Sequence, residues 1–305
     1  MDENKKTNYA AIDIGSNAVR LLIKEIKEDQ ATLCSSKLLL LRVPLRLGFD
    51  VFHDGKISEK KAKNLVRLMK SFHYLMKIYK VKHYRACATS AMREAKNGAT
   101  VINQIAQKVH IHIDIIDGQE EAKIIYKNHV ERLEDRTGNY MYVDVGGGST
   151  EINFMVQGEL LCSRSYNIGT VRQLSGVVEE SEWERLKTDL AELTCSYPQI
   201  NIIGSGGNIN KLYRLAEKKD KKTMSMSVDI LHELHARLKA LTPEERMEQF
   251  SLKPDRADVI VPAGDIFLLI ADIIKAEYIY VPVIGLSDGI IDELYLQQNG
   301  NHSSC

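Results

Sequence analysis

Two short segments of the chain combine an aspartate with a turn of small residues, a pattern that could bind phosphate. The first runs from Asp13 to Asn17 and the second from Asp144 to Thr150. Each follows an apolar run and precedes another, as in a strand, a tight turn and a second strand. Backbone N–H groups in such a turn can surround a phosphate, and the aspartate can hold a cation or orient water. An ordinary hairpin turn also explains either copy alone, because Gly and Asn are common turn residues.

The repetition of this pattern favours phosphate binding. Residues 12–17 read Ile-Asp-Ile-Gly-Ser-Asn, and residues 143–148 read Val-Asp-Val-Gly-Gly-Gly. Two such turns would form one phosphate-binding cleft if they faced each other. The candidate phosphate ligands are Gly15, Ser16, Asn17, Gly146, Gly147, Gly148, Ser149 and Thr150, and the candidate cation ligands are Asp13 and Asp144.

The two copies differ at the seventh residue after each aspartate. Arg20 stands there in the first copy and Glu151 in the second. An arginine is suited to a phosphate oxygen, whereas a glutamate can hold a metal ion or a water molecule. We therefore expect Arg20 to bind phosphate and Glu151 to join the cation ligands.

A third turn of small residues lies between a predicted strand and a predicted helix. It spans residues 204–208, Gly-Ser-Gly-Gly-Asn. Amides at the start of a helix gain the positive end of the helix dipole, which favours an anion at Gly206 and Gly207. A plain connection from strand to helix would need the same glycines.

Arg93 and Glu121 are each placed near the start of a predicted helix. Thr89 and Ser90 are expected to cap the helix that carries Arg93, whose charge at a helix N-terminus favours a bound phosphate. Glu121 follows a strand, and acidic residues often stand there because they complement the helix dipole. If Glu121 faces a phosphate site, it could instead take a proton from an attacking water.

The elements that must position these residues alternate between strands and helices. This alternation predicts an α/β fold with a partly parallel sheet, built twice because the opening pattern returns. We expect one domain over residues 1–125 and a second over 126–285, with a helix at 286–299 packing back on the first. The spacing predicts strands at 9–14, 18–26, 31–43, 83–88, 111–116, 159–166, 200–204 and 278–283, and helices at 58–79, 91–109, 181–196, 228–240, 243–250 and 255–276.

Composition excludes several classes of protein. Lys plus Arg and Asp plus Glu both number 41 in 305 residues, so no overall charge attracts a nucleic-acid polymer or an anionic membrane. No apolar run approaches the roughly 20 residues that span a bilayer. The five cysteines form no C-x-x-C pair, and we expect reduced thiols in a cytoplasmic protein.

Four motifs in order make the chain similar to the exopolyphosphatase and guanosine pentaphosphate phosphatase family. They are AIDIGSNAVRLL at 11–22, ATSAMREA at 88–95, GQEEA at 118–122 and DVGGGSTE at 144–151, and residues 204–207 and 286–289 also match. The resemblance implies two ribonuclease-H-like domains flanking an interdomain cleft, as in the superfamily of actin, sugar kinases and chaperone ATPases. It also implies a homodimer. Longer members have a further helical domain, and its absence would favour short polyphosphate chains or a nucleotide.

The resemblance implies a Mg²⁺-dependent hydrolysis that releases terminal orthophosphate from inorganic polyphosphate or guanosine pentaphosphate. Glu121 would be the water-activating base, Asp144 and Glu151 would bind metal and position water, and Arg93 would bind phosphate. Two other interpretations stay open. One is an ATP-dependent kinase for a small molecule, and the other is a sensor that binds polyphosphate or a guanosine alarmone without hydrolysing it.

Overall fold

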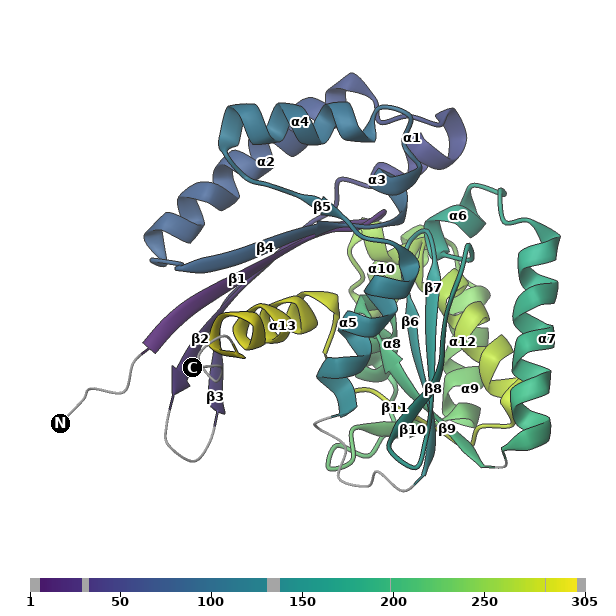
Figure 1. Cartoon of the computed structure of the whole chain (residues 1–305). Helices are drawn as coiled ribbons and strands as arrows, with labels where there is room; N and C mark the ends of the chain where they lie inside the picture. Colours follow the sequence, from purple (N-terminus) through teal and green to yellow (C-terminus); the bar gives the residue numbers. More distant parts are fainter. Residues whose placement is uncertain (1–5, 29–32, 131–137, 198, 283, 301–305) are drawn as a thin grey trace. The chain divides into compact units, whose positions relative to one another are not determined.

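The computed structural model describes residues 6–28, 33–130, 138–197, 199–282 and 284–300. Its contacts divide the chain into two compact units. Unit 1 contains residues 1–117 and 286–305, and unit 2 contains residues 118–285. Both units consist of a mixed sheet and helices, so the chain has the expected α/β fold (Figure 1).

The sheet of unit 1 begins with an antiparallel meander and continues with parallel strands. Its order is β3-β2-β1-β4-β5, where β1 pairs antiparallel with β2 and parallel with β4. Most of the strand residues in the buried apolar core of this unit come from β1, β2 and β4. The strands are β1 (Lys6–Ile14), β2 (Val19–Glu28), β3 (Leu33–Val43), β4 (His83–Ala88) and β5 (Asp114–Ile115).

Helices cover both faces of this sheet. Figure 1 shows α2 and α4 on one face and α13 on the other. Helix α2 begins where the sequence predicts, because the Ser58 hydroxyl accepts a hydrogen bond from the Lys61 amide. The helices are α1 (Leu47–Asp54), α2 (Glu59–Ile78), α3 (Ser90–Glu94), α4 (Gly98–Val109) and α13 (Leu286–Gly300).

Helix α13 is held on unit 1 by ion pairs. The buried Lys24 ammonium on β2 lies 2.8 Å from an Asp288 oxygen and 3.8 Å from Asp292. Arg85 on β4 donates to Glu293 over 2.7 Å. These contacts fix both the start and the middle of α13 against the sheet.

The sheet of unit 2 repeats the order of the first. Its order, written from the same end as in unit 1, is β8-β7-β6-β9-β11-β10. Strands β6, β7, β8 and β9 therefore correspond to β1, β2, β3 and β4. The directions correspond as well, because β6 is antiparallel to β7 and parallel to β9. The expected duplication is therefore present in the strand topology. The strands are β6 (Asn139–Val145), β7 (Thr150–Val156), β8 (Glu159–Tyr166), β9 (Ile200–Ser205), β10 (Ser225–Ser227) and β11 (Tyr278–Tyr280).

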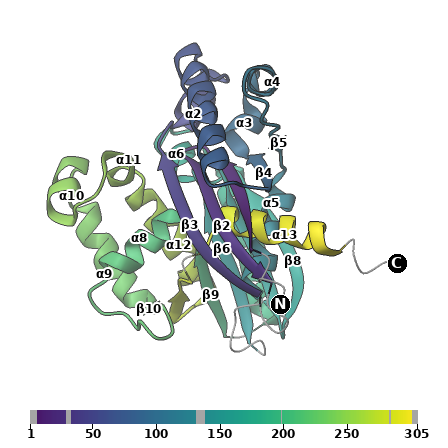
Figure 2. The same ribbon diagram turned by 90° about the vertical axis from the view of Figure 1, so that its left-hand side faces the viewer.

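Helix α5 packs on one face of this sheet, and the main apolar core lies on the other. Figure 1 shows α5 on the first face and α7 and α12 on the second. Figure 2 shows α10 and α11 side by side in the helical part of the unit. The helices are α5 (Gly118–Val130), α6 (Thr170–Leu174), α7 (Glu180–Ser196), α8 (Gly207–Leu215), α9 (Val228–Lys239), α10 (Pro243–Phe250), α11 (Pro254–Ala257) and α12 (Ile260–Ile274).

Several predicted elements differ from the observed ones. The helix expected at 91–109 is broken into α3 and α4, because the Asn97 amide exchanges two hydrogen bonds with the backbone of Ile57. The helix expected at 255–276 is broken into α11 and α12, and Arg246 Nη1 donates to the Ala257 carbonyl at the break. Residues 118–125, which the sequence analysis places in the first domain, belong to unit 2, because α5 packs on β7 and β8.

Two further observations concern the cysteines and the search for membrane-spanning helices. Cys87, Cys162 and Cys195 are free thiols, whereas the side chain of Cys34 and all of Cys305 lie outside the described part. Within the described ranges, no helix combines the length and apolar content that a membrane span needs.

Candidate functional site

The glycine loop between β6 and β7 is held by the start of α6. The Gly146 carbonyl accepts from the Thr170 amide over 3.0 Å, and the Gly147 carbonyl accepts from Val171 over 2.8 Å. The Gly148 carbonyl accepts from the buried Arg172 Nε over 2.7 Å. In a trans peptide the N–H group points opposite to the carbonyl. The amides of Gly147, Gly148 and Ser149 therefore point away from α6, as a phosphate cradle requires.

The fit between this loop and α6 depends on a glycine. A Cβ atom at Gly169 would lie 2.5 Å from both the N and the C atom of Gly148. The Thr150 hydroxyl, which the sequence analysis assigns to phosphate, donates to the Ile168 carbonyl over 2.6 Å. Thr150 thus contributes to the shape of the loop.

Two candidate cation ligands are neighbours across the sheet of unit 2. Asp144 on β6 pairs in register with Glu151 on β7, so both side chains project from the same face. Glu151 is only 2% exposed, and Ser165 Oγ on β8 donates to its Oε1 over 3.0 Å. Asp144 lies against Gly206, where an added Cβ would be 2.5 Å from Asp144 Oδ1. Gly206 also has a φ of +96°, which a glycine adopts without strain.

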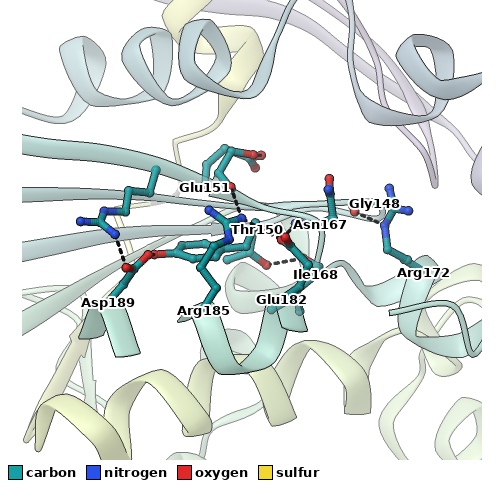
Figure 3. Close-up of polar contacts among 12 residues, drawn as sticks. Gly148, Thr150, Glu151, Asn167, Ile168, Arg172, Glu182, Arg185 and Asp189 are labelled. Atoms are coloured by element: carbon teal, nitrogen blue, oxygen red, sulfur yellow. Dashed lines mark hydrogen bonds and ion pairs between the residues drawn. The ribbon is translucent and has the colours of Figure 1, made fainter. Parts of the chain in front are cut away.

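A polar network holds the end of β8, which carries Ser165. Arg185 Nη2 on α7 donates to the Ser165 carbonyl over 2.9 Å and to Glu182 Oε2 over 2.7 Å (Figure 3). The same Glu182 oxygen accepts from the Asn167 amide over 2.7 Å. Burial alone would raise the pKa of Glu182, but the hydrogen bonds from Arg185 and Asn167 outweigh burial and lower it. Glu182 is therefore suited to remain charged within this network.

The expected base is carried by α5, in the same unit. Glu121 lies in the first turn of α5 and is 8% exposed. The helix begins tightly against β8, because a Cβ at Gly118 would collide with both Oγ and Cβ of Ser165. That Cβ would also lie 3.9 Å from Glu151 Oε1. The start of α5 is thus adjacent to the carboxylate row of the sheet.

An arginine that the sequence analysis missed lies at the third turn of small residues. The Arg256 guanidinium from α11 packs against Gly207 so closely that any Cβ there would collide with it. It also donates to Asn208 Oδ1. Arg256 is 49 residues beyond Gly207 and belongs to no motif, so the sequence offers no signal for it.

The turn in unit 1 is built like the glycine loop of unit 2. The Ser16 carbonyl accepts over 2.8 Å from the amide of Gly48, which lies within α1. The Asn17 carbonyl accepts over 2.9 Å from the amide of Arg46, which directly precedes α1. Arg20 Nη1 lies 2.5 Å from the buried Asp13 Oδ2. The two residues expected to hold a phosphate and a cation therefore bind each other.

The surroundings of Arg93 correct two expectations. Neither Thr89 nor Ser90 caps α3: the Thr89 side chain makes no capping bond, and Ser90 Oγ lies 2.8 Å from Ser16 Oγ. Helix α3 is a single turn with Arg93 near its end, where a cation is favourable without an anion. Arg93 Nη1 donates to the Ile116 carbonyl over 2.7 Å.

The sequence-predicted residues thus form two sets. Unit 2 brings together Glu121, Asp144, Glu151, residues 146–150 and the turn at Gly206 and Gly207, and unit 1 brings together Asp13, Arg20 and residues 15–17. Among the described residues, no group of three or more His, Cys, Asp or Glu could hold a metal ion. Mg²⁺ fits Asp144 and Glu151 nonetheless, because it commonly binds one or two carboxylates together with water and phosphate oxygens.

The chain is similar to known proteins over most of its length. The model of the Ppx/GppA phosphatase family matches residues 25–298. Exopolyphosphatase 2 of Mycobacterium tuberculosis is 27% identical, over 83% of this chain and 86% of that protein. The bifunctional 3-dehydroquinate synthase/phosphatase of Fusobacterium nucleatum is 28% identical, over 90% of this chain and 45% of that protein.

Further similarities extend over nearly the whole chain. The guanosine-5′-triphosphate,3′-diphosphate pyrophosphatase of Aeromonas salmonicida is 24% identical, over 97% of this chain and 60% of that protein. This chain thus spans under half of the Fusobacterium protein and under two thirds of the Aeromonas one. The crystal structure of the Ppx/GppA family member of Aquifex aeolicus matches with a TM-score of 0.76 and 27% identity, covering 97% of this chain and 99% of the other.

Proposed function

Because the chain belongs to the Ppx/GppA phosphatase family, we propose that it is a phosphoanhydride hydrolase. Its substrate class is inorganic polyphosphate or guanosine pentaphosphate, from which it releases terminal orthophosphate. The observation that carries this proposal is the register pair of Asp144 and Glu151 beside a loop whose amides point away from α6. That arrangement provides a cradle for phosphate oxygens and two carboxylates at its edge.

Glu121 is the proposed general base. It is mostly buried in the first turn of α5, and the start of that helix lies against the row containing Glu151. A carboxylate there can accept a proton from water as the water attacks phosphorus. Asp144 and Glu151 orient the attacking water and hold the cation.

Mg²⁺ is the proposed cofactor, with Asp144 and Glu151 as its protein ligands. When bound, it would neutralise charge that develops on the phosphate oxygens. Asp13, the other candidate, is already paired with Arg20, so a cation there would have to compete with a guanidinium. We therefore assign Asp13 a secondary role at most.

Each unit also carries candidate donors for phosphate oxygens. In unit 2, the Gly147, Gly148 and Ser149 amides and the Arg256 guanidinium supply donors. In unit 1, Arg20 and Arg93 are the candidate phosphate ligands. A homodimer and a cytoplasmic location stay predictions, and light scattering of the purified protein tests the first.

The decisive experiment measures orthophosphate release with Mg²⁺ from short polyphosphate, long polyphosphate, guanosine pentaphosphate and ATP. The variant Glu121→Gln should lower turnover by about 10²–10⁴-fold, the usual loss when a general base is removed. Glu120→Gln is the matched control, because Glu120 lies in the same turn and changes the same helix-dipole interaction. It should stay within about twofold of the native protein.

Other outcomes would identify another function. Tight binding of polyphosphate or the nucleotide without phosphate release would support a sensor. Consumption of ATP only when an acceptor is added would support a kinase. Equal losses in the two glutamate variants would show that Glu121 acts through the helix dipole and would overturn its role as the base.

A further inference from the structure

A buried asparagine connects the central sheet of unit 2 to the helix that carries Glu121. Asn153 on β7 is 1% exposed. Its Nδ2 donates to the Ala122 carbonyl of α5 over 2.8 Å. Its Oδ1 accepts from Ser163 Oγ on β8 over 2.5 Å. The three residues form a chain of hydrogen bonds that runs from β8 through β7 to α5.

The sheet around this polar chain also carries a small apolar cluster of Tyr140, Tyr142, Met155 and Ile203. The residues on either side of Asn153, Ile152 and Phe154, point to the opposite face and join the main core. On its own face, the register partner on β6 is the buried Tyr142. An amide in such a place costs free energy unless both ends are hydrogen-bonded. A leucine would fill a similar volume without that requirement, so packing alone does not account for Asn153.

The contact with α5 is directional, which apolar packing is not. Ala122, Ile124 and Ile125 bury the apolar side of α5, and such contacts resist separation more than sliding along the sheet. The bond to the Ala122 carbonyl fixes the helix along its own axis. Ala122 directly follows Glu121, so this bond sets the position of that carboxylate relative to β7. Glu151 lies two residues before Asn153 on the same strand and the same face.

The Ala122 carbonyl determines which way the Asn153 amide faces, because a carbonyl can only accept and must therefore face Nδ2. The Ser163 hydroxyl, which can donate or accept, then donates to Oδ1 and completes the hydrogen bonding of the amide. Register places Ser163 beside Asn153 and Ser165 beside Glu151. Two serines on one face of β8 thus each hold one polar side chain of β7.

We propose that Asn153, supported by its hydrogen bond from Ser163, is a positioning residue for Glu121. The inference rests on the proposed function, because it takes Glu121 as the base. A small displacement of a catalytic group can cost up to about 10²-fold in rate, whereas substrate contacts elsewhere are unaffected. The loss should therefore appear in kcat and leave KM nearly unchanged.

The test compares Asn153→Leu in two backgrounds. In the native background we expect kcat for orthophosphate release to fall about 10–100-fold, with KM within about twofold. In the Glu121→Gln background the same substitution should change kcat less than about twofold, because a positioning residue has no effect once its target is lost. An equal loss in both backgrounds would overturn the proposal.

A second variant covers the case in which Asn153→Leu does not fold. Ser163→Ala removes one hydroxyl and should lower kcat by about 3–10-fold, again only when Glu121 is present. Ser71→Ala on α2 is the control, because its hydroxyl donates only to a carbonyl of its own helix. Native activity with unchanged kcat in a folded Asn153→Leu or Ser163→Ala would overturn this inference alone. No release by the native protein would overturn the proposed function instead.

Discussion

Asp13 and Arg20 face each other across β1 and β2, with Arg20 Nη1 2.5 Å from Asp13 Oδ2. In unit 2 the same two register positions hold Asp144 and Glu151, which carry like charges. One sheet therefore neutralises its aspartate with a guanidinium, whereas the other gathers two carboxylates on one face. This difference is the reason that we propose a cation site in unit 2 rather than in unit 1.

The pairing of Asp13 and Arg20 predicts a non-additive effect on stability. Arg20→Ala should lower the free energy of unfolding by roughly 1–3 kcal/mol, because a buried carboxylate loses its partner. Adding Asp13→Asn should recover part of that loss, because no buried charge then remains unpaired. Denaturant unfolding of the two single variants and the double variant measures the coupling. A double variant that equals the sum of the singles would contradict the pairing.

Gly169 should be essential for the glycine loop. Gly169→Ala places a methyl group 2.5 Å from the Gly148 backbone, which cannot move without changing the loop. We expect orthophosphate release to fall at least about 10-fold, as a misplacement of about 1 Å in a binding loop can produce. Gly176→Ala is the control, because nothing lies within 4 Å of its Cβ and only its φ of +68° is strained. Steady-state kinetics of orthophosphate release by both variants tests this prediction, and thermal unfolding shows whether both are folded.

The contacts of Asp189 on α7 with Arg164 and Tyr166 on β8 predict a loss of stability in acid. Burial alone would raise the pKa of Asp189, but hydrogen bonds from Arg164 and Tyr166 lower it overall. A lowered pKa contributes stability above the unfolded value, about 3.9, and that contribution disappears as the pH falls through the lower folded value. Asp189→Asn should therefore lower the unfolding free energy by roughly 1–2 kcal/mol at pH 7. The difference should shrink toward pH 2–3, and denaturant unfolding across that range should show it. A difference independent of pH would contradict this assignment.

The anchor of α13 can be tested with two neighbouring aspartates. Asp288→Asn leaves the buried Lys24 without its close partner and should cost roughly 2–3 kcal/mol of unfolding free energy. Asp292→Asn is the matched control, because its carboxylate is 3.8 Å from Lys24 and its side chain is 35% exposed. It should cost less than about 1 kcal/mol. Similar losses in the two variants, measured by denaturant unfolding, would show that Lys24 does not distinguish between the partners.

Much of the fold follows from patterns that the sequence repeats. The strand, turn and strand after Asp13 and after Asp144 predict the duplication, and the two sheets share their strand order. Helices α1 and α6 were not predicted, because they are short and lack the capping residue and the N-terminal proline that mark the short helix α10. Both start where they bind the carbonyls of a turn, so their role became visible only in the structure.

The candidate site was partly predictable for a related reason. Motif residues such as Glu121 and Glu151 are recognisable by type and spacing. The Asp13–Arg20 pair, the contact of Arg256 with Gly207 and the bond from Asn153 to α5 depend on register and on segments far apart in sequence. Asn153 is an ordinary strand residue by position, and only its burial and its partners distinguish it.

The return of α13 to unit 1 has a consequence for synthesis on the ribosome. Residues 118–285 form one uninterrupted stretch, so unit 2 can close as soon as that stretch has emerged. Lys24 and Arg85 have to wait for Asp288 and Glu293, which are translated after all of unit 2. The half of the protein that is made first is thus completed last, and during that interval the face of its sheet that α13 covers lies open to chaperones.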